Sequence, residues 1–418
     1  MSRFYGSKFF SKDNWDDDEE ELSEGVSEEM SLMDRISDLP DTLLLRVLSL
    51  LPSAKDVVAT MVLSKRWEFL WLSVPRLVFD DQDIVEFGKF SRFVDRYLIV
   101  NDAPEIETLH FKLSRRYAAQ DIIVWMRAAN NFTVDEMIIE IDSSSCASPV
   151  ILPKFLYTEC TMLVTLNLNS VILADFSSPM FFPSLKTLSL LSVRYPDEEF
   201  ASSLLSYCHV LESLEVEKCR DDNVTLFTVR VPSLKRLVLH TSENRDRDDS
   251  DGFVINAPCL EYFNIIDHKV KRLYLCLSTS KDLYPDDTLV HRLVHLTLCT
   301  CDTEWLNLLV SMLRDSPSLR ALKLEQYHGL PAHHLRAYWN EPSSVPVCLL
   351  SSLETLEWVN YEGTEEEKEV VGFMFRNGSC LKKVTISSKS NDCNKKLEMI
   401  KELTWSIRCS PTCQLAFD

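Results

Sequence analysis

One repeated pattern constrains the fold of this chain more than any other feature. The pattern is L-x-x-L-x-L, with other apolar residues replacing some leucines, and its eleven starts span 275 residues, a mean period of 27.5. The starts are Ile106, Val134, Leu163, Leu185, Leu211, Leu234, Leu260, Leu293, Leu319, Leu353 and Leu381. Alternating apolar positions favour a strand with one buried face, and this period is typical of leucine-rich repeats.

The repeats predict an α/β solenoid, because a single unit buries too little apolar surface to be stable until it stacks on its neighbours. We expect a parallel sheet with a concave face and helical returns, the clearest at 197–207, 304–313 and 365–376. The intervals vary from 22 to 34 residues and no regular asparagine follows the strands, so the solenoid should be irregular.

The interval after Leu260 holds two strand patterns, at 260–265 and 270–275, which start only 10 residues apart. A parallel neighbour needs a crossover of about a dozen residues, so the two cannot be consecutive strands of one sheet. We expect a hairpin, one long bent strand, or one pattern expelled from the concave sheet. Any of these should weaken stacking and make amide exchange faster in 266–285 than in 163–240.

Composition excludes several classes of partner. The formal net charge of −20 opposes binding to phosphate backbones or to an anionic membrane, and no apolar run reaches the roughly 18 to 20 residues that span a bilayer. Residues 1–33 hold ten acids between Asp13 and Glu29 and predict a disordered tail, or alternatively an acidic docking peptide. The acidic start does not fit a signal peptide, so we expect an intracellular protein.

Motifs for catalysis, metals and cofactors are absent from the sequence. The eight glycines form no phosphate-binding or nucleophile-elbow motif, and the nine histidines are dispersed. Of the thirteen cysteines, the closest pairs are Cys299/Cys301 and Cys409/Cys413, and neither belongs to a zinc-binding frame. We therefore expect reduced core thiols and no catalytic residue, metal or cofactor.

Residues 34–74 predict three short helices. The first runs from about Asp41 to Leu50 and stops at Pro52, Ser53 caps the second, and Ser64 caps a third that ends near Pro75. The first helix carries a wide apolar stripe. A module this small cannot hide that surface internally, so it should expose an interaction patch.

This region resembles an F-box of the plant type, and the end of the chain resembles the FBD segment that closes plant F-box/leucine-rich-repeat proteins. The matching stretches are ISDLPD from Ile36, LLP from Leu50, DVVAT from Asp56, LSKRW from Leu63, WNEP from Trp339, CLLSSLE from Cys348 and GSCLKK from Gly378. The expected organisation is a tail over 1–33, an F-box over 34–80, leucine-rich repeats over 81–341, and an FBD segment over 342–418 that continues and caps the solenoid.

The resemblance implies a non-catalytic substrate-recognition subunit of an SCF-type ubiquitin ligase, in the nucleus or cytoplasm. The F-box would bind a Skp-type adaptor, and through it cullin and RING subunits, while the repeats hold an unknown target protein. The residues expected to contact the adaptor, or to support those that do, are Leu39, Pro40, Leu44, Leu48, Leu51, Pro52, Val57, Val58 and Trp67. Trp67 is the expected large anchor, unless it packs the helices together.

The target-binding residues are expected beside the second leucine of each repeat, where side chains point away from the core. The candidates are Glu215, Arg236, Tyr262, Asn264, His295 and Lys323. Two alternatives stay open: a repeat scaffold whose F-box-like module no longer engages the ligase, and an enzyme with a spatially assembled site.

Overall fold

The computed structural model describes residues 36, 38–83, 88–103, 105–114, 117, 119–129, 133–142, 150–153, 155–173, 180–218, 224–241, 252–266, 270–277, 290–301, 305–326 and 339–417. The expected acidic tail, 1–33, lies outside these residues. So does most of the 266–285 stretch for which faster amide exchange is expected.

The N-terminal module holds two of the three expected helices. They are α1 (Asp41–Leu48) and α2 (Ala54–Ala59), and the Ser53 side chain caps α2 by accepting a hydrogen bond from the Asp56 amide. The third expected helix is wrong: turns and two 3₁₀ helices, Thr60–Val62 and Leu70–Ser73, follow instead. The Ser64 hydroxyl accepts a hydrogen bond from the Arg66 amide and so closes a turn rather than capping a helix.

Eight parallel strands form the first sheet. In spatial order they are β1 (Arg76–Asp80), β2 (Ile106–Leu113), β3 (Val134–Ile141), β5 (Thr165–Asn169), β7 (Thr187–Leu191), β8 (Ser213–Lys218), β10 (Arg236–Thr241) and β12 (Tyr262–Ile266). The strand expected from each of the first seven repeats is present. β1, which precedes them, pairs with β2 and begins the sheet.

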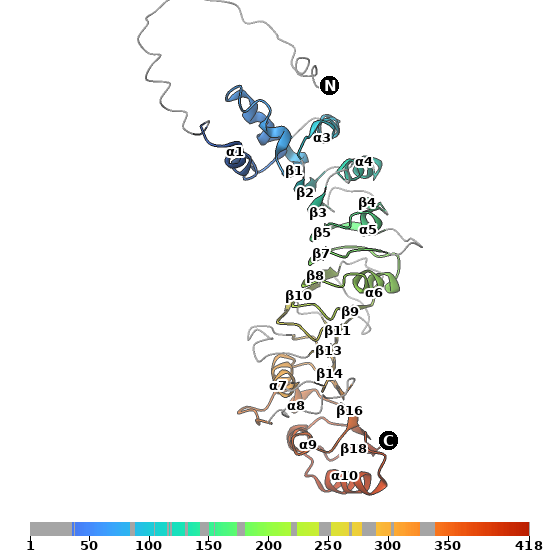
Figure 1. Ribbon diagram of the computed structural model, residues 1–418. Helices are drawn as coiled ribbons and strands as arrows, with labels where there is room; N and C mark the ends of the chain where they lie inside the picture. The colour runs from blue at the N-terminus through green and yellow to red at the C-terminus, as the bar shows by residue number, and fades with distance from the viewer. Residues whose placement is uncertain are drawn as a thin grey trace, which may run out of the picture.

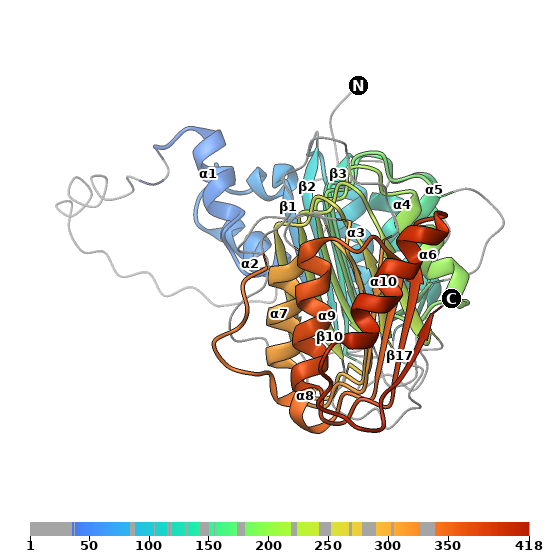
Figure 2. The ribbon, with the colours of Figure 1, turned by 90° about the horizontal axis from the view of Figure 1, so that it is seen from below.

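The returns of the first sheet are mostly helical. They include α3 (Lys89–Val100), α4 (Ala119–Ala129), α5 (Phe155–Thr158) and α6 (Glu198–Ser206), together with the 3₁₀ turn Asp81–Asp83 and a small sheet of β4 (Val150–Leu152) and β6 (Val171–Leu173). Helix α6 fills the return expected at 197–207, with Asp197 as its N-cap. These four helices lie on one side of the strands in both views (Figures 1 and 2).

A second sheet of eight parallel strands completes the array. In chain order its strands are β9 (Leu226–Arg230), β11 (Gly252–Asn256), β13 (Arg272–Cys276), β14 (His295–Cys299), β15 (Ala321–Glu325), β16 (Thr355–Tyr361), β17 (Lys383–Ser388) and β18 (Gln414–Phe417). Its returns include α7 (Trp305–Asp315), α8 (Val347–Ser351), α9 (Glu365–Asn377) and α10 (Cys393–Trp405). Helices α7 and α9 begin and end within two residues of the returns expected there.

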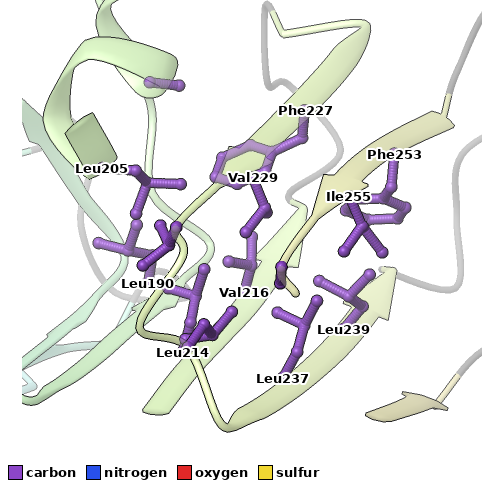
Figure 3. Packing of buried hydrophobic residues seen from close by; sticks show 14 of the residues in the cluster. Leu190, Leu205, Leu214, Val216, Phe227, Val229, Leu237, Leu239, Phe253 and Ile255 are labelled. Carbon is purple, nitrogen blue, oxygen red and sulfur yellow. The ribbon is translucent and has the colours of Figure 1, made fainter. Parts of the chain in front are cut away.

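The two sheets overlap in the middle of the array. From β8 to β13 the chain alternates between them, so β9 and β11 take the place that helices occupy in the earlier returns. Buried side chains of β8 and β10 face those of β9 and β11 across one core, as Figure 3 shows for Leu214, Leu237, Phe227 and Phe253. Strand returns form here because Phe227-x-Val229 and Phe253-x-Ile255 alternate with a period of two, whereas a helix needs a period of 3.6.

The overlap explains the short interval after Leu260. Among the described strands, β12 pairs only with β10 at the edge of the first sheet, whereas β13 lies between β11 and β14 in the second. The second pattern is therefore expelled from the first sheet, the third of the expected outcomes. The five residues between the strands connect opposite sides of the core instead of neighbours in one sheet.

Because the chain changes sheet here, the side of the solenoid that carries helices changes as well. Helices α7, α8 and α9 lie on the opposite side from α3 to α6 in both views (Figures 1 and 2). The parallel sheet with helical returns is confirmed, but the expectation of one continuous open face is wrong. The strands divide into two sheets, and each sheet has its own open face.

Candidate functional site

Exposed apolar side chains gather on the N-terminal module. Leu43, Val47 and Leu50 recur at i, i+4 and i+7 along and just beyond α1, and Leu50 is 81% exposed. Spacing of this kind places them on one face of the helix. The turns after α2 expose a further group consisting of Val62, Leu63 and Phe69. We call these six residues the F-box surface.

None of the nine predicted adaptor residues belongs to the F-box surface. The structure buries Leu44, Leu48, Val57 and Trp67 together with Val74 in a small core that packs the module. Trp67 is only 4% exposed, so the prediction that it forms a large surface anchor is wrong, and it supports the surface from beneath. In so small a module the largest apolar side chains are the ones that fill the core, because their burial gains the most free energy.

The other five predicted residues remain partly or wholly accessible. Pro40, directly before α1, and Pro52, directly before the N-cap of α2, are exposed, while Leu39 and Leu51 are half-buried against the small core. Val58 packs instead against the core of the array. Sequence reasoning placed Leu43 and Val47 in the apolar stripe but did not select them, because the stripe covers both the inner and the outer face of α1.

The module is fixed to the array by specific contacts. The Arg76 guanidinium, at the start of β1, donates hydrogen bonds to the carbonyl oxygens of Ser49 and Leu51, each at 3.2 Å. Ala54 of α2 joins the core of the array, and the Tyr97 hydroxyl donates to the Trp71 carbonyl oxygen at 2.9 Å. The module that carries the F-box surface is thus packed against the beginning of the first sheet.

The open face of the first sheet forms a groove of about 460 Å³. Strand register brings four of the six predicted target residues together in it: Glu215 on β8, Arg236 on β10, and Tyr262 and Asn264 on β12. The Arg236 guanidinium lies 4.1 Å from the Tyr262 ring centroid, a cation–π arrangement. Glu215 lies 2.9 Å from the His240 imidazole.

The groove is lined mainly by polar side chains, and Glu140, Glu215 and Arg236 are its charged residues. One register row runs through Asn167, Ser189 and Glu215, and the Ser189 hydroxyl donates to the Glu215 carboxylate at 3.3 Å. Within the described residues, the buried Asn167 side-chain oxygen has no hydrogen-bond partner. At the β2 end of the row, burial lowers the pKa of His110 although the nearby Glu140 opposes the shift. The Asn167 oxygen is buried, so a bound partner would reach it only if neighbouring side chains moved.

The other two predicted target residues belong to a different groove. His295 and Lys323 lie on the open face of the second sheet, in a groove of about 520 Å³. The Lys323 ammonium is 3.0 Å from Glu325 and 3.4 Å from Glu357. Burial would lower the pKa of Lys323, but these two carboxylates raise it overall. The structure therefore divides the six predicted residues between two grooves on opposite sides of the array.

Within the described residues, no helix has the length and apolar character needed to cross a membrane.

Comparisons with known proteins follow the same division of the chain. The F-box domain model matches residues 36–79, a model described as FBD-associated F-box protein At5g56370, LRR repeats, matches 122–271, and the FBD model matches 341–386. The repeat match ends just before β13, where the chain changes sheet. The FBD match covers α8, β16, α9 and β17, so this segment supplies two strands of the second sheet.

Similar proteins occur in Arabidopsis thaliana. The probable FBD-associated F-box protein At1g32375 is 54% identical over 92% of this chain and all of its own length. The putative FBD-associated F-box protein At5g50270 is 56% identical over 88% of this chain and all of its own length. The F-box/FBD/LRR-repeat protein At5g56420 is 41% identical over 93% of this chain and all of its own length. The chain therefore belongs to the FBD-associated F-box/leucine-rich-repeat protein family.

Proposed function

We propose that the chain is the substrate-recognition subunit of an SCF-type ubiquitin ligase. Its F-box binds a Skp-type adaptor, which brings cullin and RING subunits, and its repeats bind a target protein. The chain acts without catalysis of its own, by raising the effective concentration of a target lysine near the charged ubiquitin. This role places the protein in the nucleus or cytoplasm.

The F-box surface is the observation that carries this proposal. Seven of the described large apolar side chains of the module stay exposed, the six of the F-box surface and Ile36, although its core is already closed by Leu44, Leu48 and Trp67. An exposed apolar patch of this kind marks a protein interface. The surface also lies on a module that is fixed to the array, so a bound adaptor would hold a constant position relative to the repeats.

Adaptor binding to the full chain tests the proposal. The double variant Leu50→Ala with Phe69→Ala should weaken the affinity for a Skp-type adaptor about 30-fold, which corresponds to roughly 2 kcal/mol. The variant Leu39→Ala with Pro40→Ala probes the entrance of α1 in the same way. Ile99→Ala is a matched control, because Ile99 is 78% exposed but lies on α3 of the array.

Titration calorimetry gives the affinities, and circular dichroism checks that each variant is folded. If adaptor affinity is unchanged in both double variants, the assignment of this surface as the adaptor site is wrong. If the folded wild-type chain binds no Skp-type adaptor, the alternative applies, and the chain is a repeat scaffold without ligase function. Trp67→Ala is a poor test, since it opens the small core and weakens binding through loss of folding.

We propose the groove on the first sheet as the target site. It gathers a glutamate and an arginine stacked on an aromatic ring. Charge reversal by Arg236→Glu should reduce target capture and leave adaptor affinity unchanged, because interface charges set specificity and association rate. Lys323→Glu on the opposite groove is the matched control, and greater loss with this variant would move the target site to the second sheet.

A further inference from the structure

Three cysteine side chains meet at one end of the second sheet. Cys276 is the last residue of β13, Cys299 is the last residue of β14, and Cys301 follows two residues later. The register pairs Leu275 with Leu298, so the next residues along, Cys276 and Cys299, are side by side on the same face of the sheet. The three sulfur atoms all lie within 4.8 Å of one another.

The distances and burial of these thiols suit a shared ligand. The Cys276 and Cys301 sulfurs are 3.7 Å apart, and the Cys299 and Cys301 sulfurs are 2.9 Å apart. Sulfurs that each bond one metal ion at about 2.3 Å stand about 3.8 Å apart, so the Cys276–Cys301 distance already fits and the Cys299–Cys301 distance must widen by about 1 Å. Cys301 is half-buried and can make that adjustment, whereas Cys276 and Cys299 are held in the buried layer.

We propose that Cys276, Cys299 and Cys301 form a three-thiolate site for a thiophilic metal ion of the zinc or copper(I) class. Soft sulfur ligands select these ions over calcium and magnesium, which prefer oxygen. Copper(I) would be held by the three sulfurs alone, and zinc would keep a fourth position for water. Each thiol releases its proton to solvent as the metal–sulfur bond forms.

The position of the site gives it a structural consequence. It joins β13 to β14, the first strand pair after the chain has moved from one sheet to the other. A metal ion there would clamp the beginning of the second half of the array. Spacing along the chain could not reveal this site, because Cys276 lies one repeat before the Cys299/Cys301 pair, and the expectation of no metal rested on short-range motifs alone.

Metal titration of the full-length, reduced chain under anaerobic conditions tests the proposal. Cobalt(II), as a coloured probe for zinc, should give sulfur-to-metal charge-transfer absorption that saturates at one equivalent and is displaced by zinc. A separate titration uses copper(I) in competition with a colorimetric chelator. Cys276→Ser and Cys301→Ser should each weaken binding by at least about 100-fold, more than the loss of a supporting hydrogen bond.

The matched control is the double variant Cys409→Ser with Cys413→Ser, which removes the other close pair of cysteines and should keep full affinity. Because Cys301 is half-buried, Cys301→Ser reports on the ligand even if Cys276→Ser disturbs the fold. The proposal is overturned if neither metal binds with one-to-one stoichiometry, or if Cys301→Ser binds as tightly as the wild type. A stable disulfide among the three cysteines in the reduced preparation, detected by mass spectrometry, would also overturn it.

Discussion

The two halves of the array share one strand pattern but place their helices on opposite sides. In the first half, α3 to α6 cover one side of the strands, and in the second half α7 to α9 cover the other (Figures 1 and 2). The L-x-x-L-x-L strands look alike in both halves, with leucines inward and polar residues outward. The side that carries helices is therefore decided by the returns and not by the repeated pattern.

The overlap between the halves shows how such an exchange can be made without exposing the core. Where β9 and β11 serve as returns, both sides of the solenoid are strands with buried apolar faces. The next strand can then pair with the edge of either sheet. One short connection after β12 is enough to continue on the other side, whereas a second parallel neighbour in the same sheet would need a full crossover.

The largest expected effect comes from removing a side chain shared by both sheets. Phe227 of β9 is fully buried, with its ring centroid 5.8 Å from Tyr195 and 6.4 Å from Phe253. Phe227→Ala should cost about 3 to 5 kcal/mol and split unfolding into two transitions, because coupling between neighbouring units is lost. Denaturant unfolding followed by fluorescence and circular dichroism measures this. Phe181→Ala, at a 56% exposed position, is the control, and a single transition in Phe227→Ala would argue that the halves are coupled elsewhere.

A smaller effect is expected where the second sheet is closest packed. A Cβ on Gly252 of β11 would meet the Arg272 carbonyl oxygen and lie 2.6 Å from the Arg272 Cβ. Gly252→Ala should therefore push β13 away from β11 and destabilise the chain by about 1 to 3 kcal/mol. Gly372→Ala in α9 is the matched change, since its Cβ would meet only the flexible Arg376 guanidinium at 3.2 Å. Equal thermal stability in the two variants would contradict this account of the overlap.

The third prediction concerns the pH dependence of stability that Glu367 gives to the second half. Burial raises the pKa of Glu367, in the capping box of α9, to about 7 from an ordinary value of 4.5, although backbone N–H groups oppose the shift. The folded state binds the Glu367 carboxyl proton more tightly than the unfolded state does. The stabilisation that this proton gives is therefore complete below the pKa of Glu367 in the unfolded chain, and it is lost as pH rises through about 7. The slope should approach about 1.4 kcal/mol per pH unit between those values.

Glu367→Gln should flatten this dependence, because glutamine does not titrate. Urea midpoints measured from pH 4.5 to 8 for both proteins give the comparison. Parallel curves for wild type and variant would show that other groups control the pH response.

The smallest expected effect is local opening at the sheet edges. Strands β12 and β9 each have one neighbour in their sheet, whereas β7 and β8 have two. Amides of β12 and β9 should exchange faster with solvent than those of β7 and β8, because fewer hydrogen bonds and contacts hold an edge strand. Hydrogen exchange with mass spectrometry resolves these segments. Slowest exchange at β12 would show that the overlap is a stable centre and not a weak point.

Much of the fold could be predicted from the spacing of leucines. All eleven repeats contain the expected strand, and the helix after Asp197 begins at its capping residue. The spacing fault after Leu260 also showed where the sheet would be interrupted. The exchange of sides was not predictable in this way, because Phe227-x-Val229 and Phe253-x-Ile255 are too short to separate a strand return from an irregular one.

The candidate sites were less predictable because burial depends on packing between elements. Leu44 and Leu43 are adjacent in the same stripe, yet one is buried and the other is 45% exposed. Arg236 and Tyr262 were chosen separately and meet only through strand register. Lys323 was chosen by the same rule but lies on the other sheet, since the rule assumed that every repeat faces the same way.

The hydrogen bonds from Arg76 to Ser49 and Leu51 fix the F-box module to the first strand of the array. From β1, where the F-box ends, to β12, at the far edge of the first groove, seven steps of about 4.8 Å amount to about 34 Å. The number of strands between a residue of the groove and the F-box therefore sets the distance between them. Adding or removing a repeat would change the distance between the F-box and the groove by the spacing of one strand. A change of sheet, as after β12, would instead move the open face to the other side of the array without changing its length.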